Sequence, residues 1–144
     1  MNILLKDFIK HEKIIHLPFE YANTNGYADV IGWNIMFFFK KESNHVSAIS
    51  FDEIMETSEL SIICNEILKK MQIQLNIGDG YDKIKRMYGK ENYKDYIIEN
   101  MIRYYYLVDN TMLCFGIDKQ CGLSNFEIID DEEIIKNRLD TLIR

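Results

Sequence analysis

The side chains best able to do chemistry in this chain are carboxylates, and they occur in two short clusters. The first begins at Asp52 and Glu53, and the second is the run Asp130, Asp131, Glu132 and Glu133. Paired carboxylates can serve as the acid and base of a glycosidase, but that reaction needs a large sugar-binding groove lined by aromatic residues, and the chain has a single Trp. Acids at a helix start also complement the positive end of the helix dipole. We expect both clusters to open helices and to present an acidic surface to a basic protein partner.

Other reactive side chains lack the spacing of known sites. The histidines and cysteines show no HxH, HExxH or CxxC pattern; they are His11, His16, His45, Cys64, Cys114 and Cys121. The glycines of Gly78-Asp79-Gly80 flank an acid, and no Gly-Lys-Ser/Thr follows, which disfavours a phosphate cradle. We therefore expect no catalysis, no metal and no cofactor, with a small metal-dependent hydrolase or nuclease as the least favoured alternative.

Charge narrows the class of partner. The 144 residues hold 17 Lys and Arg against 23 Asp and Glu, a net charge of −6, and neither half of the chain is basic. Non-specific nucleic-acid binding needs several cations on one surface, so direct nucleic-acid contact is disfavoured. An acidic surface instead steers a protein toward basic partners.

The sequence also predicts a compartment. The first residues contain no basic segment followed by a long apolar stretch, and no apolar run approaches the ~20 residues that span a bilayer. The odd number of cysteines suits a reducing environment. We expect a cytoplasmic protein with no membrane contact.

Four amphipathic segments predict helices. Apolar residues at helical spacing mark residues 4–9, 60–71, 81–88 and 131–142. Gly89 is expected to end the third helix, and Asp130 with Glu133 forms a capping-box-like start for the fourth.

Alternating or β-prone segments predict strands between these helices. They cover residues 33–39 and 47–51, joined by a polar hairpin loop, and then 102–108, 113–117 and 126–128. Helices combined with sequential hairpins predict an α+β fold, in which helices pack on one face of an antiparallel sheet. The composition, 47% apolar without a linker-like segment, indicates a single domain over residues 1–144.

The two hairpin regions resemble each other. Ile35–Glu42 aligns with Leu113–Gln120 at an offset of 78, and Val46, Ile49 and Phe51 align with Leu123, Phe126 and Ile128 at an offset of 77. This pattern favours an internal duplication with pseudo-repeats at about 1–72 and 73–144. The alternative is that any two hairpins share alternation.

Aromatic and basic residues supply further candidate contacts. If Ile35 and Phe37 face the helices, Phe38 faces the other side of the sheet, where it meets either another part of the fold or a partner. Tyr105, within a run of three tyrosines, has the same two options. The short helix at 81–88 and its following loop carry Lys83, Lys85, Arg86 and Lys90. We expect them to form a solvated face, and the alternative is contact with an acidic partner.

The second half resembles a known helix-plus-sheet unit. Residues 77–90 place a glycine before a short helix and another after it, as in β-lactamase-inhibitor-like domains and small outer-membrane-assembly lipoproteins. Lys83 stands where that family usually has an acid, and Glu91 where it has proline. The resemblance implies an antiparallel sheet covered by helices on one face, with the other face available to a protein partner.

The whole chain also resembles, in size, acidity and lack of a catalytic motif, the small immunity proteins that accompany bacterial polymorphic and contact-dependent-inhibition toxins. That resemblance implies tight, non-catalytic binding to a cognate toxin domain, with a nuclease as the expected target. The alternative function is a structural or adaptor domain that binds a housekeeping partner or itself.

Overall fold

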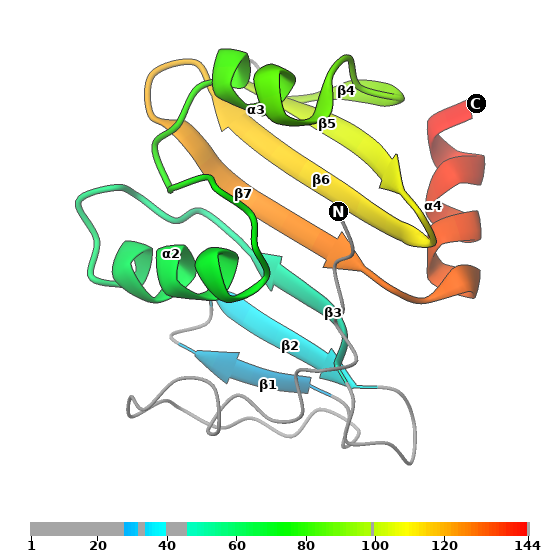
Figure 1. The fold of residues 1–144 in the computed structure, drawn as a ribbon, viewed down its shortest axis with the longest axis horizontal. Coiled ribbons are helices and arrows are strands. Elements are labelled where there is room, and N and C mark those ends of the chain that lie inside the picture. Colours follow the sequence, from blue (N-terminus) through cyan, green and yellow to red (C-terminus); the bar gives the residue numbers. More distant parts are fainter. Residues whose placement is uncertain (1–27, 32–33, 40–45, 99, 144) are drawn as a thin grey trace.

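A computed structural model describes residues 28–31, 34–39, 46–98 and 100–143 of the chain. These residues form a seven-stranded sheet and three helices (Figure 1). In chain order the elements are β1 (Ala28–Ile31), β2 (Ile35–Phe39), β3 (Val46–Phe51), α2 (Leu60–Lys70), α3 (Tyr81–Tyr88), β4 (Tyr93–Ile98), β5 (Met101–Val108), β6 (Thr111–Asp118), β7 (Gly122–Ile129) and α4 (Glu132–Ile143).

Three of the four predicted helices are present. The apolar stripe of 60–71 forms α2, which follows Glu59, and the Ser58 hydroxyl accepts the N–H of its first residue, Leu60, at 3.1 Å. Helix α3 ends at Gly89, whose φ of 78° lies in the region that glycine favours. Helix α4 forms where the C-terminal pattern predicts it. The expected helix at 4–9 lies outside the described residues, as do the three histidines.

The sheet is antiparallel throughout and confirms the predicted α+β class. Its strand order is β1-β2-β3-β7-β6-β5-β4. Two meanders, β1 to β3 and β4 to β7, are joined where β3 pairs with β7. Strands β1 and β4 were not expected from the sequence, and they occupy the two edges of the sheet.

The two aligned hairpins have the same register. Phe37 pairs with Ile49 in the first, and the aligned Phe115 pairs with Phe126 in the second. Each also has a register shift at the aligned position, after Phe38 in the first hairpin and after Gly116 in the second. The helices that follow differ, because α2 and α4 pack on opposite faces of the sheet. The duplication stays a prediction, supported by register and not by the helices.

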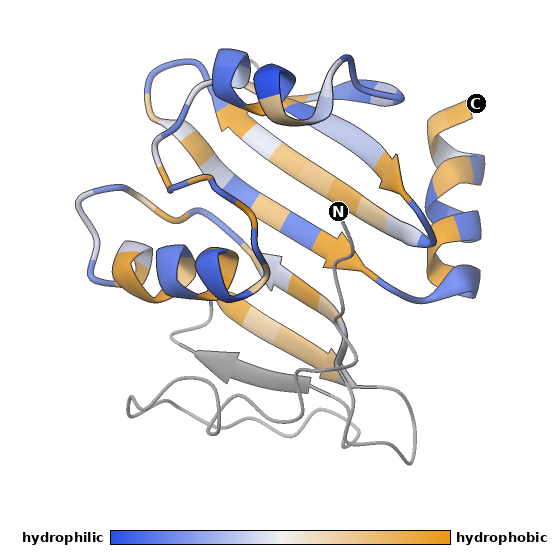
Figure 2. Ribbon diagram, in the orientation of Figure 1, coloured by the Kyte–Doolittle hydropathy of each residue, from blue (hydrophilic) through white to orange (hydrophobic). Residues whose placement is uncertain are grey.

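One face of the sheet is covered by α2 and α3 and is here called the first face. The main core lies between this face and the two helices. Alternate strand residues supply it, which gives the strands their banded hydropathy (Figure 2). Phe126 lies at its centre, with its ring 5.4 Å from both Phe51 and Phe115. Four apolar side chains of α2 complete this part of the core: Ile63, Cys64, Ile67 and Leu68.

Helix α4 packs on the opposite, second face, over a smaller core. Ile135, Leu139 and Leu142 of α4 contact sheet residues that include Met112 and Ile129. The expectation that the helices share one face therefore holds for α2 and α3 but not for α4. The reason is that β6 carries apolar residues on both faces, so its second face also requires cover.

The β6–β7 turn is held against the segment that precedes α3. The Gly78 N–H donates to the Leu123 carbonyl at 2.9 Å, and the Leu123 N–H donates to the Asp79 carbonyl at 2.7 Å. Gly122 has a φ of 75° at this contact. The two bonds fix the start of α3 to the sheet.

Tyrosines fix the rest of α3 to the first face. Tyr81 stacks on Tyr104 at 4.1 Å between ring centroids, and its hydroxyl donates to Glu91 Oε2 at 2.6 Å. The Tyr106 hydroxyl donates to the Gly89 carbonyl at 2.9 Å. Burial raises the pKa of Glu91, but the Tyr81 hydrogen bond, a backbone hydrogen bond and the charges of Lys94 and Lys90 outweigh it, and the net pKa lies below the ordinary value.

A Tyr81→Phe variant isolates this hydrogen bond, because phenylalanine keeps the stacking. A depressed carboxyl pKa contributes stability above the unfolded-state pKa and loses it as the pH falls through the folded-state pKa. We expect the variant to lower the free energy of unfolding by about 1 kcal/mol near neutral pH. The loss should start to shrink as the pH falls below about 4, and should disappear below the lowered folded-state pKa, where the carboxyl is protonated in both states.

Urea unfolding at neutral and at acidic pH measures the loss in free energy of unfolding at each pH. The matched control is Tyr106→Phe, whose lost bond to an uncharged carbonyl should cost a similar amount at both pH values. A Tyr81→Phe loss that does not change with pH would contradict the assignment.

Candidate protein-binding site

The two predicted acidic clusters lie at opposite ends of paired strands. Because β3 and β7 run antiparallel, Asp52 follows the end of β3 next to Asn125, whereas Asp130 follows the end of β7 next to Ser47. The Asn125 side chain donates to Asp52 Oδ1 at 2.8 Å and accepts the Glu53 N–H at 3.2 Å. Asp52 therefore fixes a strand end. The prediction that Asp52 and Glu53 open a helix is wrong, because α2 begins only at Leu60, and the first cluster does not join the second in one site.

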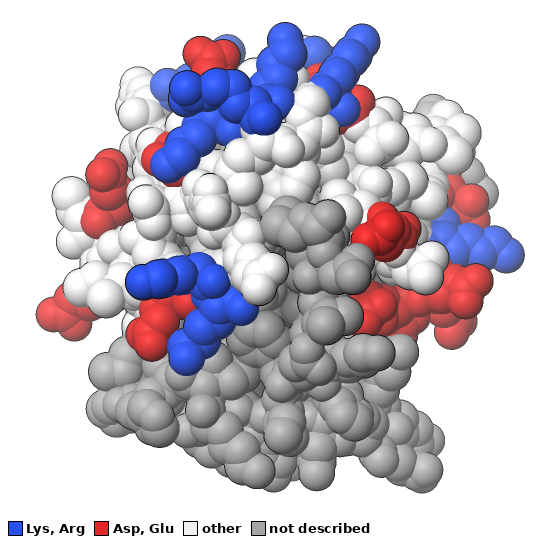
Figure 3. Space-filling view, in the orientation of Figure 1, with Lys and Arg blue, Asp and Glu red and all other residues white. Residues whose placement is uncertain are grey.

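The second cluster borders a cleft of about 620 Å³ between the β5–β6 turn and the first turns of α4. Three carboxylates line it, from Asp109 in the turn and from Asp130 and Glu132 at the start of the helix. The remaining lining residues are Leu107, Asn110, Thr111, Ile135 and Leu139. The cleft thus combines negative charge with an apolar lining, and carboxylates are visible around the start of α4 in the space-filling view (Figure 3).

Backbone bonds hold these acids in place. The Asp130 N–H donates to the Ser47 carbonyl at 2.7 Å, which ties the end of β7 to β3. Asp131 Oδ1 accepts the N–H groups of Glu133 and Ile134 at 3.0 and 3.1 Å, so Asp131 caps α4 in place of the predicted Asp130 and Glu133 pair. Within the predicted run, Asp130 and Glu132 therefore line the cleft. The Asp131 carboxylate is bonded to the backbone of α4, and Glu133 is exposed to solvent.

The structure corrects the predicted role of Tyr105. Its side chain is 1% exposed, because α4 covers this part of the second face, so it offers no surface to a partner. Phe38 lies on the same face and is half-buried against the same small core. The sequence left two options for these residues, contact with another part of the fold or with a partner. The structure shows contact with another part of the fold for both.

Charged residues that the sequence did not single out lie on the second face. Arg138 of α4 contacts Glu127 of β7 at 2.7 Å, and Arg103 contacts Asp95 across β5 and β4 at 3.7 Å. Burial lowers the pKa of Arg138, but the adjacent Glu127 charge outweighs this and raises it overall. Both pairs join elements whose contact a single sequence does not reveal, so no sequence signal marks them. The Arg138–Glu127 pair attaches α4 to the sheet beside the cleft, and the Arg103–Asp95 pair links β5 to β4.

A larger hollow, of about 1000 Å³, lies at the end of α2 and the segment that follows it. Most of its lining residues are of polar type, and they include Glu66 and Lys69. None of the predicted site residues borders it.

The cysteines have the environment of packing residues. Cys64 is 0% and Cys114 3% exposed, and burial raises the pKa of both thiols, that of Cys114 to about 12. Cys121 is half-buried, and partial burial together with Asp118 raises its thiol pKa. Within the described residues, no group of three or more His, Cys, Asp or Glu side chains could hold a metal ion.

These environments predict the order of thiol modification. The thiolate is the reactive form, so iodoacetamide should modify Cys121 first in the folded protein. Cys64 and Cys114 should react at least about tenfold more slowly, and at the rate of Cys121 once urea unfolds the chain. Peptide mass spectrometry over time measures this order. Fast modification of Cys114 in the folded protein would contradict the placement of β6.

No helix in the described part of the chain has the length and apolar character needed to cross a membrane. Comparison of the sequence with protein families and with curated proteins gives no match. Among solved structures, the chain is similar to a DUF4309 family protein (YjgB) from Bacillus subtilis subsp. subtilis str. 168. The TM-score is 0.47 at 17% sequence identity, and the alignment covers 76% of this chain and 68% of the other.

Proposed function

We propose that this protein binds a protein partner through the acidic cleft, and that the partner is a toxin domain that the protein neutralises as an immunity protein. The observation that supports the proposal is the set of three carboxylates, Asp109, Asp130 and Glu132, around an apolar lining. Two separate segments supply these acids, and the fold holds both of them.

Such a cleft suits a Lys or Arg side chain. The cationic head of either residue forms charge-assisted hydrogen bonds with carboxylates, and its methylene stem packs on apolar surface. Leu107, which is 39% exposed at the cleft, offers that surface together with Ile135 and Leu139. A basic side chain therefore has a partner here for both of its parts.

A nuclease toxin fits this chemistry. Its active-site surface carries cations that hold nucleic-acid phosphates, and those cations attract an acidic protein. An acidic binding protein that occupies this surface excludes the nucleic acid without any reaction of its own.

The test first asks whether a toxin domain is encoded beside this gene, and the absence of such a gene would overturn the immunity role. Where one is present, that domain is expressed with and without the protein. We expect growth to be restored by the protein, and a complex to be measurable by titration calorimetry. Glu132→Lys should weaken that complex by at least about tenfold and reduce protection, with the melting temperature nearly unchanged.

The matched control is Glu59→Lys, because Glu59 precedes α2 as Glu132 begins α4, and it lies away from the cleft. Equal weakening by both variants would show a general charge effect and overturn the cleft as the binding site. Binding without protection would overturn the immunity role and favour an adaptor, and the absence of any binding would overturn both.

A further inference from the structure

A second charged surface, of opposite sign, lies on α3 and the strand that follows it. Residues 82–94 carry five basic and two acidic side chains in a protein of net charge −6. We call Lys85, Arg86, Lys90 and Lys94 the α3–β4 basic surface; these side chains are exposed. Figure 3 shows Lys and Arg gathered over this part of the molecule.

Among the described residues, the four cations of this surface form no ion pair. Within the described ranges, the ion pair of this helix is that of Lys83 with Asp79 at 3.0 Å. Glu91 lies among the four cations, accepts the Tyr81 hydroxyl, and has its pKa lowered by the charges of Lys94 and Lys90. One carboxylate therefore acts on four cations, and the surface keeps a net positive charge.

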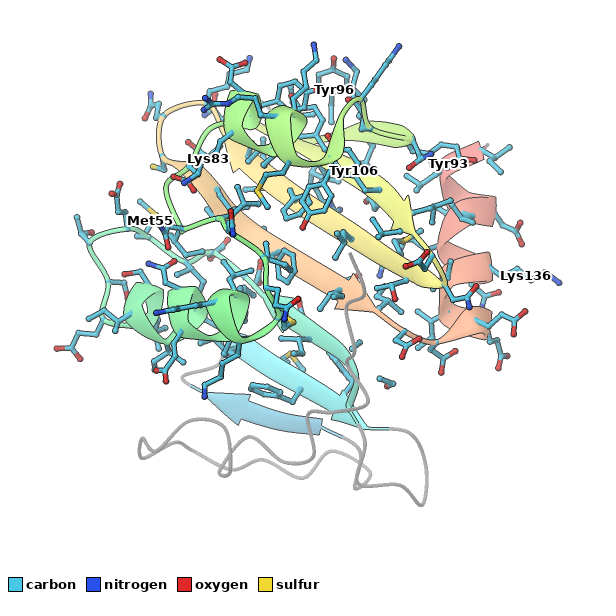
Figure 4. All side chains as sticks on the ribbon, viewed as in Figure 1. Met55, Lys83, Tyr93, Tyr96, Tyr106 and Lys136 are labelled. Atoms are coloured by element: carbon cyan, nitrogen blue, oxygen red, sulfur yellow. The ribbon has the colours of Figure 1, made fainter. Side chains whose placement is uncertain are left out.

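This surface borders an edge of the sheet. Strand β4 pairs with β5 on one side, and no described strand pairs with its other side. Lys94 and Tyr96 pair with Tyr104 and Ile102, which places them on the first face, the face that α3 covers. Tyr96 is 68% exposed, and Figure 4 shows it at this edge of the molecule.

An edge strand with free backbone groups can take an added strand from another chain. Here Ile97, 40% exposed, and Tyr96 supply apolar contact, and Lys94 lies over the Tyr96 ring at 5.8 Å. A second copy of this chain is a poor match, because antiparallel pairing would bring Lys94 near Lys94 and like charges in such positions destabilise the pair. An acidic strand meets opposite charges instead.

We propose that β4 accepts an extended acidic polypeptide segment, which adds to the sheet as a further strand while its carboxylates contact the α3–β4 basic surface. The free edge favours a polypeptide over a nucleic acid, because only a polypeptide backbone continues the hydrogen-bonded ladder. This surface lies on the first face, apart from the acidic cleft beside α4, so the inference does not depend on the proposed function.

The test uses a fluorescein-labelled peptide of alternating Val and Glu, with about six residues, the usual length of a strand. Fluorescence anisotropy should show binding that weakens with added salt. Lys90→Glu combined with Lys94→Glu should weaken it at least about tenfold. The matched control, Lys69→Glu with Lys70→Glu, changes two exposed lysines of α2 and should leave binding unchanged. Lys94→Gln is the milder variant, should the double reversal lower the melting temperature.

Two further probes separate strand addition from simple charge attraction. Hydrogen exchange of residues 93–98 should slow when the acidic peptide binds, and a version with prolines in place of the valines should not bind, since proline cannot donate to a ladder. Equal binding of the proline version, or of a Val and Lys peptide, would overturn the proposal. So would tighter binding of an oligothymidylate, which would indicate a nucleic-acid surface, or concentration-dependent dimerisation through β4.

Discussion

Substitution of Gly122 by alanine is expected to lower the free energy of unfolding by about 3 kcal/mol or more. A Cβ at this position would overlap the carbonyl oxygen of Gly78 and lie 2.6 Å from its carbonyl carbon and 2.9 Å from the Asp79 oxygen. These are backbone atoms, so no side chain can rotate away. The φ of 75° adds the strain of a left-handed conformation for alanine. Relief requires the β6–β7 turn to separate from the start of α3.

Gly80→Ala is the matched control for this substitution. It lies two residues from Gly78, has a φ of −90°, and an added Cβ would have no atom within 4 Å. We expect a change below about 1 kcal/mol. Chemical denaturation of both variants measures the difference. Equal stability of the two alanine variants would show that the turn and the start of α3 are not in contact.

Phe126→Ala is the second substitution with a large expected effect. Its side chain is 1% exposed and lies between Phe51 and Phe115, so it joins the two meanders within the first-face core. Truncation removes buried apolar surface and leaves a cavity that rigid strands cannot close. We expect a loss of about 3–5 kcal/mol.

Ile62→Ala provides the comparison, because Ile62 is 68% exposed on α2. Its loss should stay within about 0.5 kcal/mol, as for surface positions in general. Urea midpoints for the two variants test the contrast. A small loss at Phe126 would mean that the meanders are held together by backbone pairing alone.

The sequence predicted the described helices well, because each carries a local signal. The apolar stripe of 60–71 and the glycine at 89 depend on nearby residues only, and both features are present. The hairpins built from β2 with β3 and from β6 with β7 were predicted for the same reason. Local periodicity fixes an element without knowledge of its neighbours.

Long-range features could not be predicted in this way. Strand β4 begins with Tyr-Lys-Asp-Tyr, a polar segment without the apolar alternation of a strand. Its pairing with β5 is what makes it one. The face chosen by α4, and with it the burial of Tyr105, depends on the apolar second face of β6. The candidate cleft likewise combines Asp130 and Glu132 with Asp109, a residue whose proximity follows from the fold and not from spacing in the chain.

The pairing of β3 with β7 has a consequence for the order of folding. Each meander pairs strands that follow one another in the chain, whereas the β3–β7 pair closes a loop of about half the chain. Loop closure costs entropy before the contacts form, and non-local pairs slow folding. The meander of β5, β6 and β7 can therefore form early, and the joining of the two meanders is the step that completes the core. Variants in that pair, Phe126 among them, should slow refolding more than variants in α2.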